Sequence, residues 1–393
     1  MKMSPGNDTS WHLSPRLAAD VGMIVFLALF AAVILQNLLW TWDVVGYVGA
    51  AISWQEGDAV AIHTRTYQLL RSELPGSVYE SLVAGPYASA LAASPIEFHS
   101  QLDMYRIKPL YVGLLSLLGA AGFSLIDAGV VLSVVPAVLI CALVYFWLRR
   151  HIPAHFALAI TVLLSLTSRL FDVARVVLPD SLSALILVLA VFLLVERPSA
   201  LRWSLLLLVI SILVRTNNIL FVAPLLAFAL YSDHRSTGWQ SLATKQKGIT
   251  FVASIFVYLV VSAWFNHDWW RLFYHTFIGS IVDIDGFAIP FSLDLYVGVI
   301  RPRLTQIVVG GFVIVTVLLP FLVLSLLALL GSRGRSDLLR VIVLISYLNF
   351  MCYFFMFPLV EGWDRFFIPF YIFITVLAAK TAARSAERTT ELQ

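Results

Sequence analysis

Charge is scarce in this chain. Only 12% of its 393 residues are Asp, Glu, Lys or Arg, whereas 60% are hydrophobic. A soluble globular domain carries about twice that share of charge. Cysteine is scarcer still, because Cys141 and Cys352 are the only two, and both lie within apolar runs that leave no evident disulfide. The composition excludes a soluble protein and predicts an all-α polytopic membrane protein.

Long polar segments are also missing. The loops between the apolar runs are too short to fold as soluble domains, so we expect one integral-membrane domain over residues 1–393. The first apolar run is longer than a signal-peptide core and lacks a small-x-small cleavage site, which predicts a transmembrane helix and not a cleaved leader. We expect the lipid bilayer as a partner, and no nucleic acid.

The apolar runs predict about ten transmembrane helices, because roughly 20 apolar residues span a bilayer. Residues 109–122 are apolar but too few to cross, and 203–231 suit two short helices that turn at Arg215. The predicted spans are 17–39, 125–148, 153–171, 181–196, the two halves of 203–231, 249–265, 304–330, 338–357 and 366–380.

The distribution of charge predicts the orientation. With ten spans both termini share one side, which then holds 15 of the 26 Lys and Arg but only 7 of the 23 Asp and Glu. Cytoplasmic loops are rich in Lys and Arg, so we expect both termini in the cytoplasm of a cell whose inner or plasma membrane holds the chain. If 109–122 crossed the membrane, or if 203–231 formed a single span, basic residues would move to the other side and this bias would weaken.

This orientation gives the outer side one large loop, 40–124, and one medium loop, 266–303. The large loop contains an amphipathic stretch from Val60 to Glu73, turn signals at Pro75-Gly76 and Gly85-Pro86, and the apolar segment 109–122. We expect it to form helices that lie in the membrane interface.

Ionisable residues are almost absent from the middle of the spans, where transporters usually place them. They gather instead at the predicted outer ends of the helices. Such residues are Asp43, Arg106, Lys108, Arg169, Asp172, Arg175, Asp180, Arg215, Asp364 and Arg365. If the ends meet, they form a charged cavity in which Arg can bind phosphate and a carboxylate can take a proton from a hydroxyl.

The order of these features resembles that of the integral-membrane glycosyltransferases of the GT-C fold. Four stretches carry the resemblance, which covers residues 15–231 in layout and the segment near 361–370. They are Asp43-x-x-x-Tyr47 followed by Gly57-Asp58, Tyr105-Arg106-Ile107-Lys108-Pro109-Leu110-Tyr111, Ser168-Arg169 through Arg175 to Leu178-Pro179-Asp180-Ser181, and Trp363-Asp364-Arg365-Phe366-Phe367-Ile368-Pro369. Residues 1–231 would then hold the GT-C-like core, and 232–393 would add further spans and the loop 266–303.

The resemblance implies transfer of a sugar from a polyprenyl-phosphate donor to a lipid, glycan or protein acceptor on the extracytoplasmic face, with inversion at the anomeric carbon. Asp43 is then the candidate general base, with Tyr47 to orient it, and Asp180 the second candidate catalytic acid. Phosphate-binding candidates are Arg215 and Arg365, with Arg106, Lys108 and Arg175 behind them. Val44 stands where the family usually has a second acid beside the first. A divalent cation therefore stays a possible cofactor that the sequence does not decide.

Simpler interpretations remain for both acids. Asp43 could end the first helix between belt tryptophans, and Asp180 could be an N-cap of the helix that starts at Ser181. Two other functions also remain: a transporter or flippase of a lipid-linked glycan, and a non-catalytic subunit of a membrane assembly.

Overall fold

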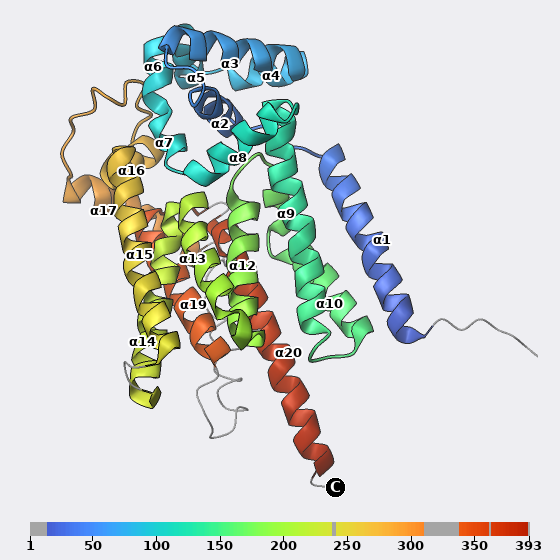
Figure 1. The fold of residues 1–393 in the computed structure, drawn as a ribbon. Helices are drawn as coiled ribbons and strands as arrows, with labels where there is room; N and C mark the ends of the chain where they lie inside the picture. The colour runs from blue at the N-terminus through green and yellow to red at the C-terminus, as the bar shows by residue number, and fades with distance from the viewer. Residues whose placement is uncertain (1–13, 238–240, 310–337, 361–362, 392–393) are drawn as a thin grey trace, which may run out of the picture.

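The computed structural model describes residues 14–237, 241–309, 338–360 and 363–391, and these fold almost entirely into helices (Figure 1). Within these described residues, five helices are long and apolar enough to cross a membrane. They are α1 (Pro15–Gln36), α9 (Leu125–Leu148), α15 (Leu242–Trp264), α19 (Leu338–Met356) and the helix formed by Arg365–Glu387, whose regular part is α20 (Ile368–Glu391). The sequence is thus that of a helical membrane protein, while the number of ten spans stays a prediction.

Further helices complete the bundle beside these five. They are α10 (Ala154–Thr167), α11 (Leu170–Ala174), α12 (Asp180–Glu196), η1 (Pro198–Ala200), α13 (Leu201–Val214), η2 (Thr216–Asn218) and α14 (Ile219–Thr237). The turn η2 confirms that the chain forms one helix before Arg215 and another after it. The predicted span 304–330 lies mostly outside the described residues.

Seven helices of the predicted large loop cover one end of the bundle, and we call them the cap layer (Figure 1). They are α2 (Asp43–Ile52), α3 (Ala59–Glu73), α4 (Gly76–Leu82), α5 (Pro86–Ala93), α6 (Pro95–Gln101), α7 (Asp103–Arg106) and α8 (Pro109–Ala120). The amphipathic stretch and both turn signals are confirmed by α3 and by the starts of α4 and α5. The 12 residues of α8 reach about 18 Å, less than the roughly 30 Å of a bilayer core.

Side-chain caps start several helices where the sequence changes from polar to apolar. Ser14, Asp58 and Ser124 each accept a hydrogen bond from a backbone N–H three residues later, at 3.2, 2.8 and 3.0 Å. Each satisfies one of the backbone donors left free at a helix start. Short polar turns thus set the ends of α1, α3 and α9.

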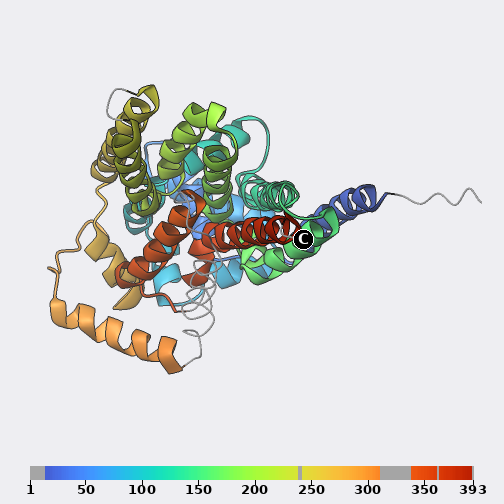
Figure 2. The same cartoon turned by 90° about the horizontal axis from the view of Figure 1, so that it is seen from below.

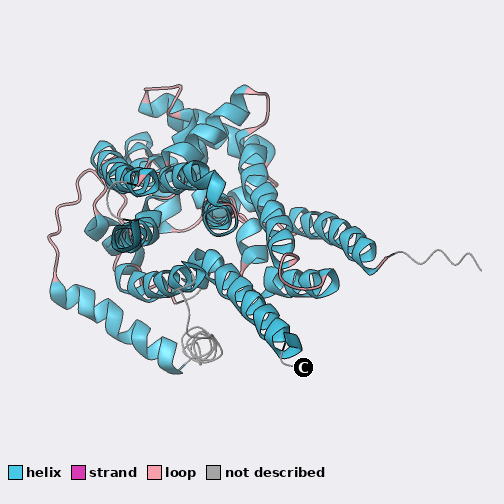
Figure 3. Cartoon of the chain, turned by 60° about the horizontal axis from the view of Figure 1, so that its bottom comes forward, coloured by secondary structure: helices cyan, strands magenta, loops and turns pink. Residues whose placement is uncertain are grey.

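Two elements lie beyond the predicted pattern. The helices α16 (Trp269–Phe277) and α17 (Leu293–Val309) both begin inside the predicted loop 266–303. Seen from below (Figure 2) and obliquely (Figure 3), α17 lies at the margin of the bundle, and its Tyr296 hydroxyl donates to the Phe355 carbonyl of α19 over 2.8 Å. The last element, η4 (Trp363–Phe367), leads into α20.

The interpretation of both cysteines as packing residues is half right, because Cys141 is buried and Cys352 is exposed.

The uncovered end of the bundle collects charges that the sequence analysis assigned to one side. Glu196 lies 3.9 Å from Arg150 and 3.8 Å from Lys380, and Asp20 pairs with Arg149. The start of α1 and the end of α20 lie at this same end (Figure 1). The first and last described helices thus begin and end at one end of the bundle, and the assignment of that end and of both termini to the cytoplasm stays a prediction.

Candidate functional site between the cap layer and the bundle

A cavity of about 490 Å³ lies where the cap layer meets the bundle, and we call it the charged cavity. Its walls come from α2, α5, α7 and the residue before α8 in the cap layer, from the starts of α12 and η2, and from α16, α19 and η4. Six of the eight residues predicted for the site line it. They are Asp43, Tyr47, Lys108, Asp180, Arg215 and Arg365.

Asp43 is the first residue of α2, and α1 has already ended at Gln36. The interpretation of Asp43 as the end of the first helix is therefore wrong. Its carboxylate is half-buried at a helix N-terminus, where the helix dipole favours a negative charge. Thr41 donates a hydrogen bond to it over 3.3 Å, and among the described residues no cation lies within ion-pair distance.

Tyr105 holds Asp43 from the opposite side. The Tyr105 hydroxyl bonds to the Asp43 carboxylate, and burial together with that negative charge raises the pKa of Tyr105 well above its usual value. The phenol thus stays protonated and donates. Its ring lies against Gly46, where any Cβ would overlap it, and packs edge-on to Tyr47 with centroids 4.9 Å apart. A glycine one turn after Asp43 is therefore required for this approach.

Lys108 lies beside this pair at the start of α8. Its ammonium group donates to the Met104 carbonyl over 3.1 Å and lies 5.1 Å from the ring centroid of Tyr47 and 5.4 Å from that of Tyr105. Both distances suit a cation–π contact. Burial lowers the pKa of Lys108 to about 8, although the charge of Asp43 acts in the opposite direction. Tyr47, itself buried, serves as the floor beneath this cation.

Asp180 and Arg215 form a buried ion pair at the top of the bundle. Asp180 is the first residue of α12, its cap position is Pro179, and its side chain makes no capping hydrogen bond. The N-cap interpretation of Asp180 is therefore wrong. The turn η2 places Arg215 opposite Asp180, and Asn218 fixes that turn by donating to Ser183 and to the Ser211 carbonyl, each over 2.8 Å.

Arg365 reaches the charged cavity from η4 at the far end of the chain. The guanidinium carbons of Arg215 and Arg365 lie 4.2 and 4.8 Å from the ring centroid of Phe366, so one aromatic ring positions both cations. The Nε atom of Arg365 is buried and has no hydrogen-bond partner among the described residues. An anion in the cavity could accept from it, since an unpaired buried donor costs free energy.

The second loop contributes residues that the sequence did not single out for the site. His267, Arg271 and His275 line the charged cavity from α16 and the turn before it. Burial lowers the pKa of both histidines, and the charge of Lys108 lowers that of His267 further. Their spacing in the sequence carries no metal-ligand pattern, and only the contact between two distant loops brings them here.

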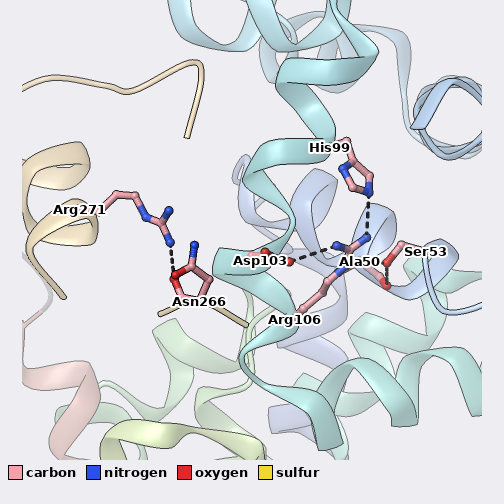
Figure 4. A network of polar contacts seen from close by, with 7 residues as sticks. All are labelled: Ala50, Ser53, His99, Asp103, Arg106, Asn266 and Arg271. Carbon is pink, nitrogen blue, oxygen red and sulfur yellow. Dashed lines mark hydrogen bonds and ion pairs between the residues drawn. The ribbon is translucent and has the colours of Figure 1, made fainter. Parts of the chain in front are cut away.

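Two predicted residues do not line the charged cavity. Arg106 donates to Ser53 over 2.9 Å and to Asp103 over 3.1 Å, and its guanidinium lies 3.4 Å from His99 (Figure 4). This network ties α7 to α2 and α6. Arg175 pairs with Asp172 over 3.3 Å, outside the cavity wall. The structure thus gives both arginines structural partners.

The described residues contain no group of three His, Cys, Asp or Glu that could hold a metal ion. Four carboxylates line the charged cavity. Asp180 and Asp103 are paired with Arg215 and Arg106, and Asp268 accepts a hydrogen bond from the backbone N–H of Trp270. Asp43 is the one whose described partners are hydroxyl donors. The donor set offers charge-assisted hydrogen bonds to an anion and one free base.

No protein-family model matches the chain, and no curated protein or solved structure shows significant similarity to it. The function must therefore be argued from the charged cavity itself.

Proposed function

We propose that the protein is a membrane glycosyltransferase that moves a sugar from a polyprenyl-phosphate donor to an acceptor hydroxyl. One observation carries the proposal: a carboxylate without a counter-cation, Asp43, lines the same cavity as Lys108, Arg215 and Arg365. A base and a group of cations in one cavity are the two parts that an inverting transfer from a phosphate donor requires.

In the proposed reaction Asp43 takes the proton of the acceptor hydroxyl. The hydroxyl oxygen attacks the anomeric carbon of the sugar, a new glycosidic bond forms, and the bond between that carbon and the phosphate oxygen breaks. The electron pair leaves with the phosphate, whose developing charge Lys108, Arg215 and Arg365 stabilise. The attack comes from the side opposite the phosphate, so the anomeric configuration inverts.

The other residues of the charged cavity prepare these groups. Tyr105 donates to Asp43 and orients its carboxylate, while Asp180 and Phe366 hold Arg215 in place. Since the described donor set does not fit a metal ion, no step of this proposal passes through one. In this proposal the cationic side chains alone bind the phosphate and stabilise its developing charge.

The position of the charged cavity suits a lipid-linked donor. It lies at the ends of apolar helices, where the phosphate of a carrier can enter while its isoprenoid chain stays in the bilayer. The charge bias of the loops supports the extracytoplasmic side of an inner or plasma membrane. We therefore propose that side as the site of transfer to a lipid, glycan or protein acceptor.

The test is transfer by the purified protein in nanodiscs, with a polyprenyl-phosphate monosaccharide labelled in the sugar. Wild-type protein should form a new glycosidic bond, and Asp43→Asn should lower kcat by about 10²–10⁴-fold, the usual contribution of a general base. Asp127→Asn is the matched control, because Asp127 also lies in the first turn of a helix but outside the cavity.

Near-wild-type transfer by Asp43→Asn would remove the central claim. Movement of the labelled lipid across the bilayer without a new glycosidic bond would show a flippase instead. Loss of transfer in Asp127→Asn as well would point to a general effect on the membrane-inserted fold.

A further inference from the structure

A second hollow lies next to the charged cavity, on the cap layer, and we call it the aromatic groove. It measures about 280 Å³, and none of the described residues that line it is charged. Its lining comes from the connection between α1 and α2 and from the turn between α4 and α5. The residues that matter here are Trp40, Trp42, Ser81, Ala84, Gly85 and Tyr87.

Tyr87 lines both hollows, so it forms the partition between them. Its hydroxyl donates to Gln101 over 3.0 Å, and its ring packs edge-on against Trp42 with centroids 5.3 Å apart. Trp42 directly precedes Asp43 in the chain. The two hollows therefore meet at Tyr87 and at the adjacent residues Trp42 and Asp43.

The lining has the chemistry of a site for a neutral ring. Trp40 is half-exposed, and its indole, the indole of Trp42 and the phenol ring of Tyr87 supply aromatic surface at the groove. Pyranose rings pack their axial C–H groups on such faces, because the ring faces carry negative charge. The indole N–H of Trp42 is buried without a hydrogen-bond partner among the described residues, so an acceptor oxygen is lacking there.

We infer that the aromatic groove binds an uncharged pyranose of the acceptor, which makes the acceptor a glycan or glycolipid. The role of this pyranose as the acceptor rests on the proposed function, whereas the binding of a pyranose in the groove does not. The cations proposed to hold the donor phosphate, Lys108, Arg215 and Arg365, line the charged cavity and not the aromatic groove. The groove is therefore separate from the proposed phosphate site, and inversion requires the acceptor hydroxyl to attack the anomeric carbon from the side opposite that phosphate.

An isoprenoid chain is the competing occupant. It needs contact with the hydrocarbon core, but the lining of the groove comes from the cap layer and from residues beyond Gln36, where the apolar helix α1 ends. Gly85 in the lining has a positive φ of 85°, and a Cβ added there would meet no atom within 4 Å. The position therefore favours a water-soluble sugar.

The probes are methyl β-D-glucopyranoside, methyl β-D-galactopyranoside and methyl α-D-mannopyranoside. Their binding to the full-length protein in nanodiscs is measured by saturation-transfer NMR. Ser81→Trp fills the groove without removing a core side chain. Ser89→Trp is its matched control, since Ser89 is also exposed, also donates to the carbonyl three residues earlier, and does not line the groove.

We expect at least one pyranoside to receive saturation from wild-type protein and from Ser89→Trp, and none from Ser81→Trp. Trp40→Ala should weaken binding by about 2- to 12-fold, the value of one aromatic contact. In the transfer assay Ser81→Trp should raise the KM for the acceptor and leave that for the donor unchanged.

Three results would overturn the inference: no saturation of any pyranoside, equal signals from Ser81→Trp and Ser89→Trp, or loss of geranylgeranyl phosphate binding in Ser81→Trp with pyranoside binding intact. The last would assign the groove to the carrier chain. Pyranoside binding by Asp43→Asn protein separates the two proposals, because it persists even where transfer is absent.

Discussion

Asp43 and Asp180 line the same cavity but lie in opposite surroundings. Asp180 is 5% exposed and paired with Arg215 at the top of the bundle. Asp43 lies in the cap layer, half-buried, with hydroxyl donors around it and no described cation within ion-pair distance. The carboxylate of Asp180 is thus occupied by a guanidinium, whereas that of Asp43 has no such partner among the described residues and lines the cavity where a substrate hydroxyl would lie. The comparison separates an acid that organises the site from one that can react.

Breaking the buried pair tests the first half of this comparison and should have the largest effect on stability. Arg215→Ala leaves Asp180 as an uncompensated buried charge, which should lower the free energy of unfolding by about 3–5 kcal/mol. Unfolding by denaturing detergent, followed by helical circular dichroism, measures the loss.

Asp43→Asn is the contrasting variant in the same assay, and its free energy of unfolding should stay within about 0.5 kcal/mol of wild type. Removing both charges with Asp180→Leu and Arg215→Leu should restore much of the stability that Arg215→Ala loses. An equal loss in Arg215→Ala and Asp43→Asn would erase the distinction between the two acids.

The hydroxyl that orients Asp43 should matter for rate and little for stability. Tyr105→Phe removes a hydrogen bond to a charged group, worth about 1.5–3 kcal/mol, so kcat should fall by roughly 10- to 150-fold. The acceptor KM should change little, and steady-state kinetics separate the two constants. If the acceptor KM rose with kcat unchanged, Tyr105 would be a binding residue and would not orient the base.

The close contact between Gly46 and Tyr105 should resist even one methyl group. Gly46→Ala forces the ring away and should cost about 1–3 kcal/mol of stability through overpacking. Gly298→Ala is the control, because that helical glycine has open space around it and should gain about 0.5–1 kcal/mol. A neutral Gly46→Ala would show that the cap layer packs less tightly at Asp43 than described.

The smallest effect concerns pH. Lys108 carries its charge below its pKa of about 8 and loses it above, so donor affinity should be constant at acidic pH and fall at most tenfold per unit above pH 8. Tyr47 and Tyr105 have raised pKa values and His267 a lowered one, which keeps them out of this window. Lys108→Arg stays charged and should flatten the profile; an unchanged profile would exclude Lys108 from donor binding.

Local sequence predicted those parts of the site that local rules determine. Segment length and charge were enough to place the turn at Arg215, and the first charge after the apolar helix pointed to Asp43. Arg106 could not be assigned in this way. It precedes Lys108 by two residues, and positions two apart on helical turns face different sides, so one enters the cavity while the other binds Asp103.

The contribution of α16 could not be predicted, because it depends on pairing between distant loops. His267 and His275 read as ordinary loop residues until the loop 266–303 is placed against the cap layer. The side chain of Gln101 fixes that placement by donating to the carbonyls of Ile281 and Val282, over 3.1 and 2.6 Å. No periodicity in either segment encodes a contact across 180 residues.

This bond from Gln101 also sets an order of assembly. During synthesis the cap layer emerges early, whereas its partners at Ile281 and Val282 follow 180 and 181 residues later and Arg365 later still. Domains fold from the N-terminus as the ribosome supplies them. Asp43 and its tyrosines can therefore pack long before the wall that faces them exists. We therefore expect the nascent chain to present Asp43 in an incomplete charged cavity, whose remaining wall is added only near the end of translation.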